Sequence, residues 1–490
     1  MTHFISTRGG VAPVDIEAAV LQGYAADGGL FVPQTIPRIS EEQLQKWSKL
    51  SFVDLAFEIL SLFIERAVLT ADDLRRLLTN SFNRFDQPDV VPVVRLETMS
   101  NTYVLELFHG PTLSFKDLAM GFLVNLVDFF LQRKNDWASL VVATTGDTGP
   151  AAAHASAGKK SIECWVLYPN EMISEEQARQ MTTLEASNVH AVAVNGCPDG
   201  GDDLDLVIAR MFADDSLRGQ LKLSSVNSIN WCRVMVQAVH YFFSYFRVVD
   251  RVGEKIVFSV PSGAFGNLFG GYLARTMGLP VKAYICANNQ NATLHRALST
   301  GRFTKEDLIP TVSSAIDIVA PYNFWRYLYF VSGRDHDKIC QWMDDFQKQG
   351  SVHLDSRTAD AIRDGYISAS ITDEETLSTI ADVFQSRDCY LLDPHAAVAV
   401  AAADKLSNTF APDTKIICLA TAHSAKFPDV VRKALSVEGE LPEQAMHQSI
   451  EGAKGLCQHV RLCDCSKLAP ALTHAMQSVT ERRVNSSKIE

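Results

Sequence analysis

The sequence predicts an α/β fold in which two parallel-rich sheets are covered by helices and preceded by a mostly helical N-terminal region. From about residue 96 onward, short β-branched runs alternate with helix-forming stretches, a pattern typical of parallel sheets with crossover helices. Two of these units carry a glycine-containing loop between strand and helix, at Ser139–Lys159 and Lys255–Gly278. The chain has 490 residues, of which 47% are hydrophobic, enough for two or three domains with sizeable cores.

The N-terminal region, residues 1 to about 95, is predicted to be mostly helical. Apolar residues recur at the spacing of a helix in four segments: Val14–Gly23, Glu41–Leu50, Val53–Leu62 and Thr70–Asn80. The segment Gly28–Pro33 adds a turn and a short extended piece, and residues 88–94 lead into the next region.

The region 96–440 is predicted to carry both sheets, in a smaller mobile domain at about 100–225 and a larger domain at about 226–440. Candidate strands are apolar runs: Thr102–Leu107, Leu140–Thr144, Ile162–Tyr168, Val189–Val194, Ile256–Val260, Val281–Cys286, Ile316–Ala320 and Lys415–Ala420. Candidate helices fill many of the gaps: Asp117–Arg133, Pro150–Ala157, Glu175–Glu185, Asp202–Ala213, Ile229–Phe246 and Asn267–Met277. Residues 441–490 are predicted to form a helical and irregular C-terminal extension.

The bulk composition excludes several classes of partner. A net charge of −12 argues against nucleic acid or an anionic membrane as a general partner. No apolar run reaches the roughly 18 residues that a membrane-spanning helix needs, and the start of the chain lacks the pattern of a secretory signal. Ten cysteines without regular spacing indicate reduced thiols, so we expect a cytoplasmic protein.

Two clusters resemble metal sites but have simpler interpretations. The spacing of Cys457, His459, Cys463 and Cys465 lacks the usual C-x2-C knuckle, which favours a thiol-bearing surface turn or strand over a zinc site. The second cluster is an acidic run that consists of Asp199, Asp202, Asp203 and Asp205. It favours a solvated first helical turn over a calcium-binding loop. We therefore predict no bound metal.

Lys116 is the first candidate for chemistry. It lies between Phe115 and Asp117, at the start of the predicted helix that continues to Arg133. A surface lysine at a helix start is the simpler interpretation, but the positive end of the helix dipole disfavours a cation there. That position and partial burial both favour the neutral amine, which a Schiff-base lysine requires.

The loop Pro261–Asn267 is the second candidate and has the features of a phosphate cradle. Gly263 and Gly266 permit tight turns and a close approach of the backbone N–H groups to an anion at the start of the next helix. A strand-to-helix turn without a ligand is the alternative. The motif is neither G-x-G-x-x-G nor a P-loop, so it supports neither a dinucleotide fold nor a nucleotide triphosphatase.

Two further loops offer polar groups at strand ends. Residues 144–149 read TTGDTG, in which Asp147 is either a simple helix N-cap or part of a loop that grips a substrate carboxylate or a cofactor oxygen. Thr421 follows the apolar strand KIICLA and could hydrogen-bond a heteroaromatic nitrogen.

Taken in order, these motifs resemble threonine synthase in its longer form, a family of fold-type II pyridoxal-phosphate enzymes related to the tryptophan synthase β subunit. The resemblance runs nearly end to end and rests on these segments: STRGG, DGGLFVP, ELFHGPTLSFKD, ATTGDTG, VLYPNEMISEEQARQMTT, SVNSINWCR, VPSGAFGN, LDPHAAVAV and TAHSAKF. It implies a tryptophan-synthase-β-like fold and pyridoxal 5′-phosphate as the cofactor.

The resemblance also implies roles for individual residues. Lys116 would hold the cofactor as a Schiff base, Asp147 would lie near its 3′ oxygen, and Thr421 would face its ring nitrogen. The cofactor phosphate would be bound by the backbone of Gly263, Ala264, Phe265, Gly266 and Asn267. The substrate carboxylate would meet Thr144, Thr145 and Thr148. Candidates for the substrate phosphate are Ser225, Asn227, Ser228, Asn230 and Arg233.

The implied reaction is conversion of O-phospho-L-homoserine and water to L-threonine and phosphate. The chain departs from the usual family pattern at Ala264, Thr145, Pro150 and Ser424, and in the segments 288–296 and 313–329. The altered segments bear on substrate choice rather than on cofactor use. Two alternatives therefore stay open, a phospho-lyase that releases 2-oxobutyrate and a non-catalytic paralogue. The sequence leaves monomer or homodimer unresolved.

Overall fold

The computed structural model describes residues 3–170 and 172–486 and contains two parallel-rich sheets, as the sequence predicts. The larger sheet has the order β13-β10-β9-β14-β4-β3 and is parallel except for the antiparallel edge strand β3. Its strands are β3 (Val93–Leu96), β4 (Thr102–Glu106), β9 (Ile256–Pro261), β10 (Val281–Asn288), β13 (Tyr366–Ser370) and β14 (Ile416–Ala420).

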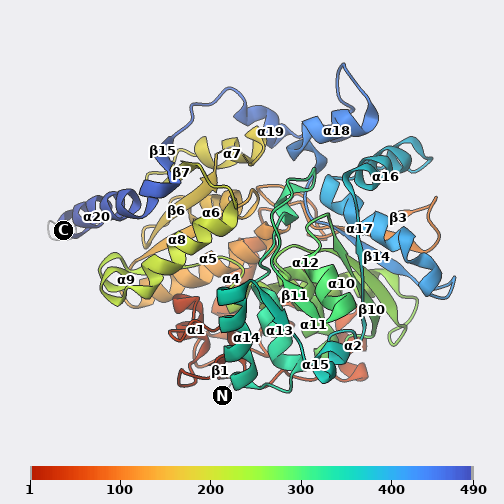
Figure 1. Ribbon diagram of the computed structural model, residues 1–490, viewed down its shortest axis with the longest axis horizontal. Helices are drawn as coiled ribbons and strands as arrows, with labels where there is room; N and C mark the ends of the chain where they lie inside the picture. The colour runs from red at the N-terminus through yellow and green to blue at the C-terminus, as the bar shows by residue number, and fades with distance from the viewer. Residues whose placement is uncertain (1–2, 171, 487–490) are drawn as a thin grey trace.

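The smaller sheet has the order β15-β7-β6-β5-β8 and is parallel throughout. Its strands are β5 (Ala138–Ala143), β6 (Ile162–Pro169), β7 (Val189–Asn195), β8 (Leu223–Ser224) and β15 (Val460–Asp464). Figure 1 shows this sheet with the C-terminal helix α20 on one side of the molecule, and α16 and α17 beside the larger sheet on the other.

The core lies on both faces of each sheet, because successive side chains of a strand point to opposite faces. In β5, Leu140 and Val142 join a cluster that includes α5 and α10, whereas Val141 joins a separate cluster with α8 and α20. In β9, Phe258 faces α10, and Val257 packs with α16 and α17. Burial on both faces explains why these strands are continuous apolar runs rather than alternating patterns.

Three of the helices around the two sheets contribute to the candidate active site: α5 (Lys116–Arg133), α10 (Trp231–Val248) and α11 (Gly266–Met277). The other helices of this region are α6 (Thr148–Ser156), α7 (Glu175–Thr182), α8 (Gly201–Ala213), α9 (Asp215–Leu221), α12 (Thr293–Thr300), α13 (Asn323–Val331), α14 (His336–Gln349), α15 (Ser356–Ala361), α16 (Asp373–Gln385), α17 (Pro394–Lys405) and α18 (Pro428–Leu435). The C-terminal part adds α19 (Gln448–Ala453) and α20 (Leu468–Ser486). Short 3-10 turns are η1 (Ser314–Ile316), η2 (Ser407–Thr409), η3 (Ser424–Lys426), η4 (Glu443–Ala445) and η5 (Cys465–Lys467).

The N-terminal region is helical, and its helices begin where side chains cap them. Its helices are α1 (Ile16–Gln22), α2 (Glu41–Trp47), α3 (Phe52–Leu60) and α4 (Ala71–Phe82). Asp15, Ser40, Ser51 and Thr70 each accept a hydrogen bond from the backbone N–H three residues later, which satisfies a donor that the helix leaves unpaired. Helices α3 and α4 pack on α10 and α5, so this region shares its core with the larger body.

Two small antiparallel pairs complete the strands. β1 (Phe4–Ser6) pairs with β2 (Phe31–Pro33), and β11 (Arg302–Thr304) pairs with β12 (Ser351–His353). In the part of the chain that the structure describes, no helix is both long and apolar enough to cross a membrane.

Three expectations from the sequence are wrong. The segment 316–320 is not a strand; after η1 it is irregular, and Ile316 and Ile318 pack against Gly263. The C-terminal extension is not only helical and irregular, because β15 adds an edge strand to the smaller sheet. The acidic run does begin α8, but it is not fully solvated, since burial raises the pKa of Asp202 to about 6 and that of Asp205 to about 7.

The cysteine-rich segment lies at the edge of the smaller sheet. Cys457 is exposed, and Cys463 and Cys465 are half-buried in and after β15. Among the described residues, no group of three or more histidine, cysteine, aspartate or glutamate side chains is placed to hold a metal ion.

Candidate active site

Four loops at the carboxyl ends of β4, β5, β9 and β14 meet at one cavity. Its lining includes Lys116, Asp147, Arg233, Thr421 and the loop 261–267. The lysine and the glycine loop, which are far apart in the sequence, therefore face the same space. This placement matches the general rule that α/β sheets bind ligands beyond the carboxyl ends of their strands.

Lys116 is the first residue of α5, and main-chain hydrogen bonds fix the loop before it. The Phe115 N–H donates to the Thr421 carbonyl oxygen over 2.9 Å, and the His423 N–H donates to the Leu113 carbonyl oxygen over 3.1 Å. These bonds hold the lysine beside the end of β14. Burial, followed by the charges of Arg233 and Lys426, lowers the pKa of Lys116 to about 8, although Asp147 opposes the shift. The amine is therefore neutral far more often than that of a surface lysine.

The loop 262–267 has the geometry of an anion cradle. Phe265 has a left-handed backbone conformation with φ of 63° and directly precedes α11, whose first N–H groups have no partner within the helix. Gly263 has no room for a side chain, because an added Cβ would lie 2.9 Å from the Ile316 Cα and 3.1 Å from its carbonyl oxygen. The backbone of the loop thus lies against the wall of the cavity.

Buried polar atoms without partners surround this cradle. Among the described residues, the Nε and Nη2 of Arg233, the Oγ of Ser262 and the Nδ2 of Asn267 form no hydrogen bond. The Arg233 side chain is 0% exposed, and only its Nη1 has an oxygen partner, the Val226 carbonyl oxygen at 2.8 Å. Because unpaired buried donors are strongly unfavourable, this cavity fits one or more anionic groups.

Asp147 occupies the N-cap position of α6, but its side chain does not cap the helix. Instead, its Oδ1 accepts a hydrogen bond from the Nε2 of Gln177 over 2.8 Å and forms an ion pair with the Nζ of Lys426 at 2.7 Å. Burial opposes ionisation of Asp147, yet the charge of Lys426 and the hydrogen bond from Gln177 hold the pKa of its carboxyl below the usual range. The N-cap interpretation is therefore wrong for the side chain, and Asp147 is an ionised group at the cavity.

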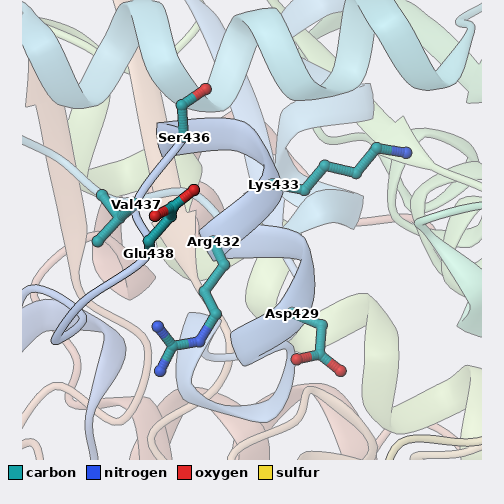
Figure 2. A pocket seen from close by; sticks show the side chains of 6 residues that line it. All are labelled: Asp429, Arg432, Lys433, Ser436, Val437 and Glu438. Carbon is teal, nitrogen blue, oxygen red and sulfur yellow. The ribbon is translucent and has the colours of Figure 1, made fainter.

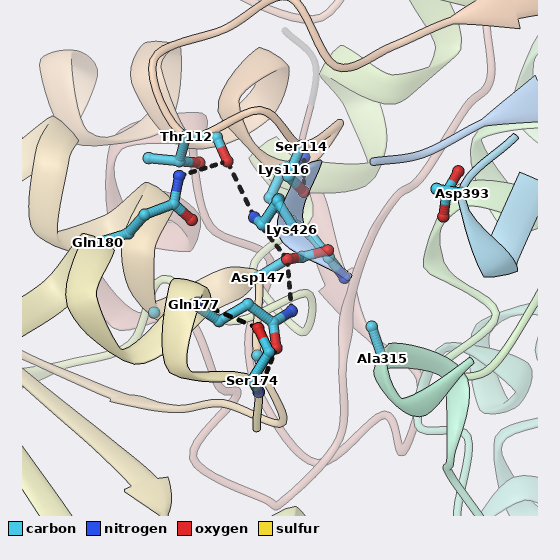
Figure 3. A network of polar contacts seen from close by, with 12 residues as sticks. Thr112, Ser114, Lys116, Asp147, Ser174, Gln177, Gln180, Ala315, Asp393 and Lys426 are labelled. Atoms are coloured by element: carbon cyan, nitrogen blue, oxygen red, sulfur yellow. Dashed lines mark hydrogen bonds and ion pairs between the residues drawn. The ribbon is translucent and has the colours of Figure 1, made fainter. Parts of the chain in front are cut away.

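Sequence reasoning missed Lys426 and His395, although both lie in quoted motifs. Figure 3 shows Lys426 between Thr112 and Asp147. His395 lines the cavity and contacts the Oδ1 of Asp393 through Nδ1 at 2.7 Å, and its Nε2 accepts a hydrogen bond from the Ala315 N–H over 3.1 Å. A lysine in the short loop that directly follows an apolar strand was the signal that could have identified Lys426.

The predicted substrate residues do not all reach the cavity. Ser228 and Arg233 line it. Thr144 turns inward, where its Oγ1 accepts hydrogen bonds from the N–H groups of Gly146 and Gly149, each over 3.0 Å. The following predicted residues are also outside its lining: Thr145, Thr148, Ser225, Asn227 and Asn230.

The side chain of Asn230 forms hydrogen bonds that hold the start of α10 in place. It caps α10 through a hydrogen bond from the Cys232 N–H to its Oδ1, and its Nδ2 donates to the carbonyl oxygens of Val20 and Ser225. These contacts occupy the amide group and favour a role in holding α10 rather than in substrate binding.

A shallow depression elsewhere on the surface has no residue in common with this cavity. It lies at the C-terminal end of α18 and is lined by Asp429, Arg432, Lys433, Ser436, Val437 and Glu438 (Figure 2). Its charged side chains point in different directions, and the cavity at Lys116 remains the candidate site.

The glycine loop leads to a testable prediction for ligand binding. Gly263→Ala is expected to weaken the binding of pyridoxal phosphate by about 10-fold or more, because overpacking against the Ile316 backbone costs about 1–3 kcal/mol. A fluorescence titration of the cofactor-free enzyme measures this affinity. Gly219→Ala is the matched control, since an added Cβ at Gly219 meets nothing within 4 Å. Equal affinities in both variants would show that the loop is not the cradle.

His109 lies in the segment between β4 and α5, and its contacts predict how the stability of the fold depends on pH. Its Nδ1 and Nε2 lie 2.8 Å from carboxylate oxygens of Asp86 and Glu106, and its side chain is 13% exposed. Burial lowers the pKa of His109, but the contacts with Glu106 and Asp86 outweigh burial and raise it overall.

A raised pKa means that these contacts stabilise the fold fully below the unfolded-state pKa of about 6.5 and are lost as pH rises through the higher folded-state value. The difference in unfolding free energy between wild type and His109→Gln is therefore expected to shrink by about 1 kcal/mol between pH 6 and pH 9. Urea unfolding of both proteins at the two pH values measures it. A difference that stays constant or grows with pH would contradict the prediction.

Comparisons with known proteins agree with this geometry. Residues 3–82 match the family described as Threonine synthase N terminus, residues 87–422 match Pyridoxal-phosphate dependent enzyme, and residues 396–468 match Threonine synthase, C-terminal. A threonine synthase of Schizosaccharomyces pombe is 38% identical, over 88% of this chain and 89% of that protein. The chain belongs to the threonine synthase family. A protein of Xenopus laevis called threonine synthase-like 2 is 36% identical over 98% of this chain and 99% of its own length.

Solved structures of threonine synthases have the same fold. The enzyme from yeast aligns with a TM-score of 0.90 and 33% identity, over 99% of both chains. The pyridoxal-phosphate-bound enzyme from Brucella melitensis aligns with a TM-score of 0.88 and 35% identity, over 98% of this chain and 99% of that one. These findings confirm the fold-type II architecture, the pyridoxal-phosphate cofactor and the classification as a lyase of the threonine synthase family.

Proposed function

We propose that this enzyme converts O-phospho-L-homoserine and water to L-threonine and phosphate, with pyridoxal phosphate held by Lys116. The observation that carries the proposal is that one cavity brings together a buried lysine of lowered pKa, a glycine-rich anion cradle and a buried arginine with unpaired donors. The cofactor has one phosphate and the substrate has another, so two anion sites close to one amine suit this pair of molecules.

The residues divide between cofactor and substrate. The backbone of Gly263, Ala264, Phe265, Gly266 and Asn267 would hold the cofactor phosphate. Asp147 would lie near the 3′ oxygen of the cofactor, and Thr421 would face its ring nitrogen. Arg233 and Ser228, which line the cavity, would bind the substrate phosphate.

The bound cofactor would supply an electron sink that makes bonds at Cα of an amino acid labile. Lys116, released when the substrate amine binds, would take the Cα proton onto its Nζ and return it later in the reaction. Its lowered pKa makes the neutral amine, the form that accepts a proton, more populated near neutral pH than in a surface lysine. Arg233 would stabilise the negative charge on the departing phosphate through charge-assisted hydrogen bonds. Enclosure of the cavity between the two sheets would limit access of stray water.

Identification of the product tests the proposal. Purified holoenzyme incubated with O-phospho-L-homoserine should release phosphate and form threonine in equal amounts. Formation of 2-oxobutyrate with phosphate would favour the phospho-lyase alternative, and no phosphate release would favour a non-catalytic paralogue. We also propose a cytoplasmic location, which the ten unpaired cysteines support, because free thiols are typical of reducing compartments.

A further inference from the structure

Lys426 is a second buried lysine at the site, and its contacts lie at the cavity wall rather than in solvent. Its side chain is 0% exposed. The Nζ forms an ion pair with the Oδ1 of Asp147 at 2.7 Å and donates to the Thr112 carbonyl oxygen over 2.9 Å. In Figure 3 the ammonium group lies between these two partners. Lys426 therefore holds a carboxylate that itself lines the cavity.

The contacts of Lys426 join segments from both sheets. Lys426 follows β14 of the larger sheet, Asp147 follows β5 of the smaller sheet, and Thr112 precedes α5. From α7, Gln177 donates to the same oxygen of Asp147 over 2.8 Å, and Gln180 donates to the Thr112 carbonyl oxygen over 3.1 Å. The Asp147 carboxylate is thus held from two sides.

Gln177 is itself fixed in place. Its side chain and Ser174 form a capping box at the start of α7. It also packs against Gly146, where an added Cβ would lie 2.5 Å from the Gln177 Nε2. Gln177 is thus held in place, but it carries no charge. Lys426 is therefore the partner that supplies the opposing charge to Asp147.

We propose that Lys426 is a positioning residue that fixes the Asp147 carboxylate toward the cofactor and adds a buried positive charge to the wall of the site that holds Lys116. This inference rests on the proposed role of Lys116 as the cofactor lysine. A buried aspartate without this partner would either take up a proton or move, since an uncompensated charge in the interior is strongly unfavourable. Lys426 therefore fixes both the geometry and the charge of the group.

The electrostatic part of the proposal depends on the groups that face Lys116. Burial, Arg233 of α10 and Lys426 lower the pKa of Lys116, and Asp147 raises it. Asp147 in turn faces Lys426 and His395 of α17. Removing Lys426 takes away a cation whose charge opposes protonation of Lys116, so a protonated nitrogen becomes more favourable there.

The test is the pH dependence of the visible absorbance band of the holoenzyme, in which the cofactor is joined to Lys116. The pH midpoint of this band in Lys426→Met is expected to rise by about one pH unit relative to wild type, which is typical for the loss of one nearby charge. Lys426→Arg retains the charge and is expected to keep the wild-type midpoint.

Lys415→Met is the matched control, because Lys415 is also a buried, ion-paired lysine but precedes β14 rather than following it. It is 9% exposed and pairs with Asp250 at 2.8 Å and Glu254 at 3.1 Å. Its loss should leave the midpoint unchanged. An unchanged midpoint in Lys426→Met, or an equal shift in Lys415→Met, would overturn the proposal.

A second comparison covers the case in which Lys426→Met does not fold. Asp147→Asn and the double variant Asp147→Asn/Lys426→Met differ only in the Lys426 charge, and neither leaves a buried carboxylate unpaired. The midpoint should be higher in the double variant, and equal midpoints would also overturn the proposal. A wild-type enzyme without the absorbance band would instead contradict the role of Lys116 and hence the proposed function.

Discussion

Replacing Lys116 with alanine is expected to lower the rate of phosphate release from O-phospho-L-homoserine by about 1,000-fold or more. The variant loses the amine that holds the cofactor and the base that takes the Cα proton, and a base alone contributes about 100- to 10,000-fold. The visible absorbance band of the joined cofactor should disappear at the same time. Phosphate release under saturating cofactor and the absorbance spectrum measure the two effects.

The fold of this variant should remain intact, because alanine is a good helix former at the first position of α5 and removes a buried amine of lowered pKa. Circular dichroism and thermal unfolding provide the control. Lys159→Ala, which removes a lysine paired with Asp128 at 3.1 Å, should retain both the band and the activity. A Lys116→Ala enzyme that keeps its absorbance band would refute the assignment of the cofactor lysine.

Replacing Arg233 with methionine is expected to lower kcat/KM for O-phospho-L-homoserine by about 100-fold or more. Loss of one partner of a buried, hydrogen-bonded charge pair costs about 2–5 kcal/mol, and Arg233 offers two unpaired donors to a phosphate. Burial also lowers the pKa of Arg233 to about 10, a sign that the guanidinium needs an anion to compensate it. Steady-state kinetics measure the effect.

The cofactor should still bind to this variant, since the proposed cradle is the backbone of 263–267. Arg247→Met is the matched control, because Arg247 lies in the last turn of the same helix, α10, with its guanidinium carbon 4.1 Å from the centre of the Phe243 ring. Its kinetics should match wild type. If Arg233→Met loses the cofactor instead and binds substrate normally, Arg233 belongs to the cofactor phosphate.

The interior strands could be predicted from the sequence because strands that are buried on both faces consist mostly of apolar residues. The eight residues of β6 are all buried, and all but Glu163 are uncharged, which is typical of a strand that is covered on both faces. Residues 316–320 are also mostly apolar, but they form no strand, and Ile316 and Ile318 pack beside Gly263 instead. Local composition does not distinguish a strand from a loop that packs against a cavity.

The edge strand β15 could not be predicted for the opposite reason. Its residues are mostly exposed, and Leu462 is 68% exposed, so no burial pattern marks it. What makes it a strand is its pairing with β7, from which it is separated by most of the chain. Such long-range pairing leaves no local signal.

The site residues also divide into those that a local sequence pattern marks and those that depend on distant segments. Lys116, the glycine loop and Thr421 each follow a strand or start a helix, and local chemistry was enough to select them. Asn230 was selected for its polar amide, but that amide caps α10 and donates to the carbonyl oxygens of Val20 and Ser225. Lys426 was missed because its partners, Asp147 and Thr112, come from distant segments.

The pairing of β15 with β7 has a consequence for how the protein is made. A ribosome delivers the chain from the N-terminus, so β7 leaves the tunnel long before its neighbour exists. Until residues 460–464 have been made, the edge of the smaller sheet at β7 carries unpaired main-chain groups that can pair with other chains. The nascent enzyme thus depends on β15 to cover an edge that is prone to self-association.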